Sequence, residues 1–484
     1  MTVDGPRSEA RRLYRAFEER GDVTDLQAAV ALFRDVLAGT PDDDGTRARA
    51  LRELAAAQQV LYTQVGRLSD LQMAIGLTRE AISCRTHEEL RAVAGDQSNL
   101  SNALRLEYEA TGRLGALHEA IDLARTAVLA TATDHAGRAA RLSNLGYALR
   151  LRFAHTGRAA DIDDAVDIGR AALAAAGDDD PRMARLRSNL GVALRERYER
   201  TGAAQDLQEA IRLAIDAAAT TPSDDPHRPG LLTNVGLALY QRFKATEQHD
   251  DLDRAIVAQR AALGSIHTES PDAAVYALNL ANALRTRAAQ TMDQSQIDDA
   301  VAAAELADSL LPANHPDHVL ALSALGRTLR LRYERHRDTS DAARSVAARR
   351  AAAAVPTAPP EERAIAALTA AEWATEDNDM SAAILAYATA VALLGQVAWH
   401  GMEHHDREHQ LGRWRNLAQD AAASALRASR PHQAIELLEQ GRSVLWNQHL
   451  QYRADIDDLR RRRPTIASRL QEVRAALAIG TRPR

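Results

Sequence analysis

Cysteine and lysine are almost absent from the chain, and aromatic residues are scarce. The only cysteine, Cys84, excludes an internal disulfide and any zinc site that needs several cysteines. Because Cys84 follows a predicted helix, we expect it to have a structural role. Lys244 is the only lysine, which leaves one candidate for Schiff-base chemistry. Aromatic residues make up 4% of the chain and hydrophobic residues 46%, so the core must consist mainly of Ala, Leu, Ile and Val.

A strong charge imbalance is missing as well. The net charge is −6, with 66 acidic and 60 basic residues, and it gives no support to nucleic-acid or membrane binding. We find no apolar run of about 18 residues and no hydrophobic leader in the N-terminal stretch MTVDGPRSEARR. We therefore expect a cytoplasmic protein that binds neither nucleic acid nor membrane.

What the sequence does contain is a repeat. A motif of the form SNLGxALR recurs, and its asparagine falls every 45 residues, at Asn99, Asn144, Asn189, Asn234 and Asn279. The glycine that ends the motif falls at Gly66, Gly112, Gly157 and Gly202. A fixed period of about 20–50 residues indicates a repeat architecture, in which each unit contacts only its neighbours. A repeat array can therefore extend over 484 residues, more than a usual single domain, without an evident linker.

Each repeat reads as two helices joined by a turn, as the unit from residue 180 to residue 220 illustrates. Asp180 and Pro181 predict the start of the first helix, and Gly202 predicts its left-handed C-terminal stop. Asp206, with Glu209 three residues later, predicts a capping-box-like start of the second helix. The apolar stripe of the first helix comprises Leu186, Leu190, Leu194 and Tyr198.

Small residues recur on both helices of the repeat. The first helix carries them at Gly146, Gly191, Gly236, Ala281 and Gly326. The second helix carries alanine at Ala29, Ala74, Ala120, Ala165, Ala210, Ala255 and Ala300. We expect the two backbones to approach each other closely at these positions, where a bulky side chain would overpack the interface.

The Leu190-Gly191 pair, Leu194 and Ala210 together resemble the tetratricopeptide repeat, although the period is longer than the usual 34 residues. The resemblance covers residues 8–355 and implies an all-α fold, namely a right-handed α-solenoid of about ten helix-turn-helix hairpins. We divide the chain into eight such hairpins over residues 1–357, two divergent hairpins over 358–453 and a charged helical tail over 454–484. The divergent region contains all four tryptophans: Trp373, Trp399, Trp414 and Trp446.

The stretch from Ala434 to Arg460 carries a second resemblance. It is similar to the segment that joins repeat arrays to the caspase-like CHAT domain of bacterial proteins, a domain with a His-Cys dyad. The chain stops at Arg484, too soon for such a domain, and Cys84 lies in the second repeat. The resemblance thus implies a regulatory region without protease activity. Either a catalytic domain follows in a longer protein, or the chain is a stand-alone relative.

Two polar ladders on the first helices are the candidate binding residues. On a helical wheel Ser188, Asn189 and Arg195 share one face. The asparagine ladder consists of Asn99, Asn144, Asn189, Asn234 and Asn279, and the arginine ladder of Arg105, Arg150, Arg195, Arg285 and Arg330. The family resemblance implies that the first helices line a concave groove that holds a protein or peptide. Asn suits an extended backbone and Arg suits carboxylates.

Alternatives to ligand binding stay open for these ladders. Asn can instead bridge neighbouring repeats, and Arg can pair with the plentiful acidic residues, which would make a purely structural scaffold. The groove can also be filled by the chain's own tail. A second arginine series lies on the second helices, where we expect solvated or inter-repeat ion pairs: Arg34, Arg79, Arg125, Arg170 and Arg260.

Catalytic signatures are not found. The sequence has no Gly-rich phosphate loop, no G-x-S-x-G motif and no paired-carboxylate signature. In the histidine-rich stretch 400–409, His405 and His409 have the spacing to share a metal on a helix, but Glu408 is misplaced for an H-E-x-x-H site. We therefore predict no enzyme, no cofactor and no metal. An enzyme or metal site at 400–409 is the alternative.

Overall fold

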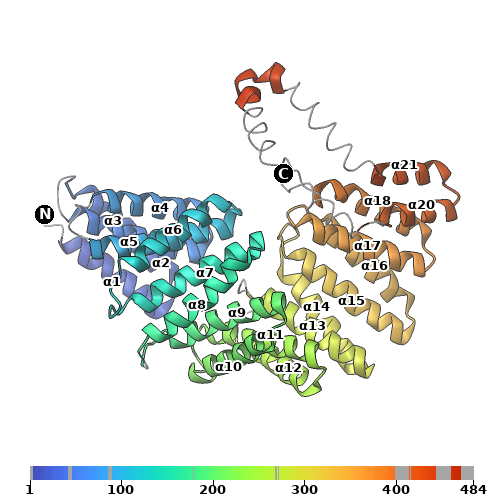
Figure 1. The fold of residues 1–484 in the computed structure, drawn as a ribbon, viewed down its shortest axis with the longest axis horizontal. Coiled ribbons are helices and arrows are strands. Elements are labelled where there is room, and N and C mark those ends of the chain that lie inside the picture. The colour runs from blue at the N-terminus through green and yellow to red at the C-terminus, as the bar shows by residue number, and fades with distance from the viewer. Residues whose placement is uncertain are drawn as a thin grey trace, which may run out of the picture. The chain divides into compact units, whose positions relative to one another are not determined.

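The computed structural model of the protein describes residues 4–41, 46–84, 90–177, 179–266, 270, 272–397, 414, 416–442 and 459–469 (Figure 1). Within these ranges the regular elements are helices, and no β-strand occurs among them. Consecutive helices pack against each other as antiparallel hairpins, which confirms the predicted all-α solenoid of helical hairpins. The chain divides into two compact units, residues 1–242 and 243–484.

The first unit contains five complete hairpins. Its helices are α1 (Asp4–Arg20), α2 (Val23–Ala38), α3 (Arg47–Val65), α4 (Leu68–Ser83), α5 (Leu90–Thr111), α6 (Leu114–Leu129), α7 (Arg138–Thr156), α8 (Ala159–Ala175), α9 (Met183–Thr201), α10 (Ala204–Thr220) and most of α11 (Arg228–Thr246). As predicted, alanine and leucine dominate its core, and the cluster shared by α6 to α10 includes Leu145, Leu190 and Ala210.

The second unit continues the same pattern. Its helices are α12 (His249–Gly264), α13 (Ala273–Thr291), α14 (Gln294–Leu310), α15 (His318–His336), α16 (Thr339–Ala354), α17 (Pro360–Glu376), α18 (Met380–Val397), α20 (Leu417–Arg427) and α21 (Pro431–Arg442). Short helical turns also occur at 459–462 and 464–469. The largest core cluster of this unit joins α15 to α21 and is again rich in alanine.

Helix α18 corrects one expectation. The sequence does contain an uncharged stretch of 18 residues, Met380–Val397, with a mean hydropathy of 1.7. Among the described helices it is the one whose length and composition are sufficient to cross a bilayer. Buried core helices meet the same criterion, and here Ile384, Tyr387 and Val391 are buried against α17 and α20.

The glycine that ends each first helix behaves as predicted. Gly202 has a φ of +71°, and its N–H donates to the carbonyl of Tyr198 at 2.8 Å. A residue without a Cβ takes this left-handed conformation without steric cost. Later repeats lack the glycine but keep the conformation, with φ of +58° at Glu247 and +51° at Met292.

The close approach of the two helices is also confirmed. A Cβ placed on Gly191 would lie 3.3 Å from the carbonyl oxygen of Ala210, and one on Gly146 would lie 3.4 Å from that of Ala165. A Cβ on Gly326 would lie 3.1 Å from the carbonyl oxygen of Ser345. The small residues therefore mark the line along which the two helices of a hairpin touch.

The predicted N-terminal caps are wrong in detail. Helix α9 begins at Met183, and Asp180 instead accepts a 2.8 Å bond from the backbone N–H of Arg182, so it caps the turn before the helix. Helix α10 begins at Ala204, so Asp206 lies inside its first turn. Asp206 is buried and accepts two bonds from the side chain of Arg197 on the preceding helix.

That interaction, which we call the hairpin ion pair, recurs along the chain. Each example joins a first-helix arginine to an aspartate nine residues later, as in Arg152–Asp161, Arg197–Asp206 and Arg332–Asp341. The two nitrogens of Arg197 meet the two carboxylate oxygens of Asp206 at 2.7 Å each. Such bidentate contacts fix the angle between helices as well as their distance.

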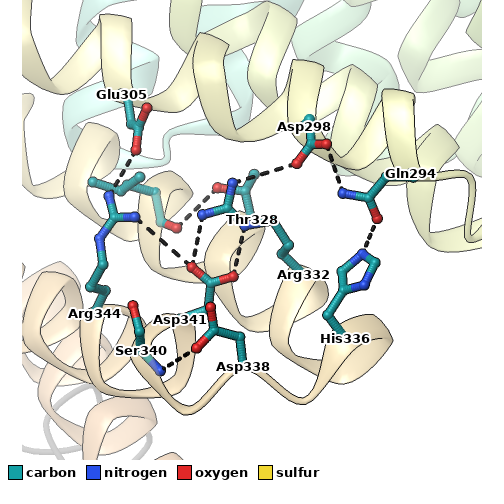
Figure 2. A network of polar contacts seen from close by, with 11 residues as sticks. Gln294, Asp298, Glu305, Thr328, Arg332, His336, Asp338, Ser340, Asp341 and Arg344 are labelled. Carbon is teal, nitrogen blue, oxygen red and sulfur yellow. Dashed lines mark hydrogen bonds and ion pairs between the residues drawn. The ribbon is translucent and has the colours of Figure 1, made fainter.

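Figure 2 shows one hairpin ion pair and its extension to the neighbouring hairpin. Arg332 binds Asp341 at 2.7 Å and reaches Asp298 of α14 at 3.5 Å. Arg344 of α16 binds Glu305 of α14 at 2.7 Å. These bonds hold Asp341 in its charged form, so the pKa of Asp341 lies below its usual 3.8, chiefly because Arg332 donates to it.

Candidate functional site

The predicted ladders lie on helices that contact each other directly. In the first unit α7 touches both α5 and α9, and in the second unit α15 touches both α13 and α17. These are the first helices of successive hairpins. We call the surface that they form within each unit the first-helix surface.

The asparagine ladder makes bonds between repeats. The side-chain amide of Asn189 donates to the hydroxyl of Ser143 at 2.9 Å, and that of Asn234 donates to Ser188 at 2.9 Å. Both serines are buried, so Ser188 does not lie on the open polar face that the helical wheel indicated. At these two positions the bridging alternative describes the structure, and contact with a ligand stays a prediction. Asn99 is exposed, and Asn144 and Asn279 are half-buried.

The arginine ladder of the first unit is paired with acidic residues. Arg150 donates to Glu196 at 2.6 Å, and Arg195 donates to Glu199 at 2.6 Å. Arg105 binds the carboxylate of Glu109 and also donates to Asn102 at 2.7 Å. The first-helix surface thus carries both signs of charge, and a ligand must exchange partners with these ion pairs in order to bind.

Tyr147 joins two members of this ladder, which the sequence did not reveal. The guanidinium carbons of Arg105 and Arg150 lie 4.8 and 4.6 Å from the centre of its ring. Its hydroxyl donates to Glu109 at 3.0 Å. Burial, aided by Glu109, raises the pKa of Tyr147. The result is a polar and aromatic patch that spans α5 and α7.

Beside this patch lies a crevice lined by Tyr147, Arg150 and Asn189 among others. Its cavity volume of about 10 Å³ holds no more than one water. Glu196, at the edge of the patch, has one carboxylate oxygen that is buried without a hydrogen-bond partner among the described residues. Burial raises the pKa of Glu196, although Arg150 opposes the shift. A ligand would therefore lie along this surface without entering a pocket.

In the second unit the two ladder arginines differ from each other. Arg330 is buried and fully engaged, with bonds to Glu376 at 2.6 Å and Asp377 at 2.7 Å, and with the ring of Trp373 5.7 Å away. Arg285 is half-buried, and its Nε is shielded from solvent without a hydrogen-bond acceptor in the described ranges. The two positions are equivalent in the repeat but not in their surroundings.

Four of the five members of the second arginine series, all except Arg34, form the predicted inter-repeat ion pairs. Exposed contacts of this kind join the second helices of neighbouring hairpins: Arg79–Glu119, Arg125–Asp164, Arg170–Glu209 and Arg260–Asp299. Exposed pairs contribute about 0–1 kcal/mol each. The series therefore contributes little to the free energy of unfolding.

Other residues singled out by the sequence have mixed outcomes. Cys84 is exposed at the C-terminal end of α4, so it is not a core residue. The histidines of 400–409 lie outside the described residues, as do Trp399 and Trp446. Within the described ranges no group of His, Cys, Asp and Glu side chains has the arrangement of a metal site.

Comparison with known proteins agrees with the helical-hairpin class. Residues 183–217, which cover α9 and most of α10, match the family model of the tetratricopeptide repeat. No curated protein matches the chain. Among solved structures, BtubC (BKLC) from P. vanneervenii is 18% identical with a TM-score of 0.35, over 54% of this chain and 94% of that one. The C-terminal part of a TPR repeat-containing protein from Cytophaga hutchinsonii is 16% identical with a TM-score of 0.35, over 66% of this chain and 99% of that one.

Proposed function

We propose that the chain is a scaffold that binds a protein or peptide on its first-helix surface and has no catalytic activity of its own. The observation that carries the proposal is the patch of Arg105, Tyr147 and Arg150, whose side chains combine aromatic area, hydrogen-bond donors and positive charge. Aromatic and arginine side chains are the types that dominate protein interfaces. The tetratricopeptide match at 183–217 supports the proposal, since repeats of this family generally bind proteins or peptides.

The partner is a separate question from the surface. We propose that the scaffold regulates a CHAT-type caspase-like effector, in the same chain or in another, and acts in the cytoplasm. This rests on the similarity of residues 434–460 to the segment that precedes such domains. Of that segment, the structure describes α21 and the residues from 459 onward.

The repeat itself offers a test with a matched control. Arg105, Arg150 and Arg195 lie on first helices, whereas Arg79, Arg125 and Arg170 lie on second helices of the same region and are likewise paired with acidic residues. Each set is changed to Gln together, and the two triple variants have the same net charge.

Pull-down from the source organism, followed by an affinity titration, should recover the same partner with the wild type and with the second-helix variant. The first-helix variant should lose it, because its ion pairs and its stacking on Tyr147 are removed. Equal binding by all three proteins, with unchanged melting, would refute the proposal. Loss of binding in the second-helix variant alone would place the interface on the opposite helices.

A further inference from the structure

Arg349 of α16 is a buried cation without an anionic partner. Its residue exposure is 5%, and its Nε has no hydrogen-bond acceptor in the described part of the chain. Its guanidinium lies 5.2 Å from the centre of the Trp373 ring. This cation–π contact is favourable, but it replaces only part of the hydration that the guanidinium loses on burial. Burial of a charge without a paired counter-ion is costly, so natural proteins rarely retain one without a reason.

Two further arginines lie near enough to Arg349 to repel its charge. Arg285 of α13 also has a buried Nε without an acceptor among the described residues, and Arg327 of α15 donates to Asn282 at 3.1 Å. The pKa of Arg349 is lowered to about 10, first by burial and next by repulsion from Arg327, with Arg285 adding to it. We call these three residues the arginine cluster. It draws its members from three helices of the second unit.

Acidic residues near the cluster do not neutralise it. Glu362 and Glu372 attract Arg349, but both are exposed and neither forms an ion pair with it. Although Glu372 is exposed as a residue, partial burial of its carboxyl, together with repulsion from Glu376 and Asp420, raises its pKa more than Arg349 lowers it. The nearby ladder arginine, Arg330, in contrast, binds two carboxylates. Arg285 and Arg349, whose buried Nε atoms have no acceptor among the described residues, differ in this respect from Arg330.

The geometry points to a binding site for a carboxylate in the arginine cluster, supplied by an acidic side chain of the protein partner. This inference rests on the proposed function and specifies the chemistry of the partner. A carboxylate accepts parallel bonds from a guanidinium fork, and two or three forks around one anion give a strong, water-poor contact. Arg285, Arg327 and Trp373 are half-buried, so the cluster is open to a ligand at its outer side.

The test uses the full chain and a defined probe. The probe is a fluorescein-labelled hexaglutamate peptide with an amidated C-terminus, and hexaglutamine is its neutral control. Arg285→Gln and Arg349→Gln are the test variants. Arg344→Gln is the matched control, because it removes the same charge from α16 at an exposed position that is already paired with Glu305.

We expect hexaglutamate, and not hexaglutamine, to bind the wild type. Each test variant should weaken binding about tenfold, as for loss of one charged hydrogen-bond pair, and the control less than about twofold. Arg349→Gln should keep or raise the melting temperature, because it removes a buried unpaired charge. A lower melting temperature would show that Arg349 has a structural partner and would contradict the site. Arg285 is half-buried, so Arg285→Gln tests binding with less effect on the stability of the fold.

Unchanged binding by the Arg285→Gln/Arg349→Gln double variant would overturn the site, and so would equal binding of the two peptides. Inorganic phosphate is the competing anion. If it displaces hexaglutamate at lower concentration than glutarate does at constant ionic strength, the cluster is a phosphate site and the carboxylate assignment is wrong. Failure here is distinguishable from failure of the proposed function, which depends on residues of the first unit and on pull-down of a protein partner.

Discussion

The hairpin ion pair gives the most quantitative prediction for stability. In Arg197→Met, a side chain of similar length replaces the arginine and leaves the carboxylate of Asp206 without its two bonds. The Asp206 side chain is 9% exposed and that of Arg197 is 18% exposed, so the pair is largely but not wholly removed from water. Removing one partner of a buried pair costs about 3–5 kcal/mol, and the residual exposure of Arg197 leads us to expect about 3 kcal/mol.

The double variant Arg197→Met/Asp206→Leu distinguishes the cost of leaving one charge unpaired from the net contribution of the ion pair. Replacing both charges with apolar side chains often costs little, so we expect the double variant to recover most of the loss. Unfolding of a repeat array is not strictly two-state, so native-state hydrogen exchange of the α9 and α10 amides is the appropriate assay. Wild-type protection in the single variant, or equal loss in both variants, would refute the reasoning.

Three further changes test the fold. Gly191→Leu should lower the free energy of unfolding by about 1–3 kcal/mol in denaturant titration, because the new Cβ would lie 3.3 Å from the Ala210 carbonyl; no change would mean that the helices are not in contact there. Glu247→Gly should raise it by about 0.5–1 kcal/mol, because Glu247 has a φ of +58° and glycine takes that conformation without strain; a loss would show that the Glu247 side chain is needed. The lowered pKa of Asp341 means that its pairing with Arg332 stabilises the protein fully above pH 3.8 and is lost as the pH falls through the folded value. The wild type should therefore exceed Asp341→Asn in stability at pH 6 and lose that advantage progressively as the pH falls below 3.8, and a constant difference would contradict the linkage.

Local signals in the sequence predicted the hairpins well. Gly202 and Gly191 were interpreted correctly because a left-handed stop and a close backbone contact each depend on the residue's own lack of a side chain. Asp206 was misinterpreted as a cap because its partner, Arg197, lies on the preceding helix. Capping patterns consider only residues near the start of the same helix, so they do not include this partner. The helix nevertheless begins within two residues of the expected position.

Longer-range contacts account for what the sequence did not reveal. Asn189 binds Ser143, which is 46 residues away, and no spacing rule distinguishes that bond from contact with a ligand. Arg349 belongs to no predicted ladder, because its surroundings depend on how three helices meet. Charge balance over the whole chain is nearly neutral, so composition cannot reveal a local cluster of arginines.

Cysteine labelling on one hairpin tests the central claim, that a protein binds the first-helix surface. In a Cys84→Ser background, Glu199→Cys places a thiol on α9 and Asp216→Cys places one on α10. The native side chains are matched, because their exposures are 44% and 43% and each is paired with an arginine four residues earlier. With saturating partner, we predict that maleimide labelling slows at residue 199 and is unchanged at residue 216. Protection at 216 alone, or at neither position, would contradict the account.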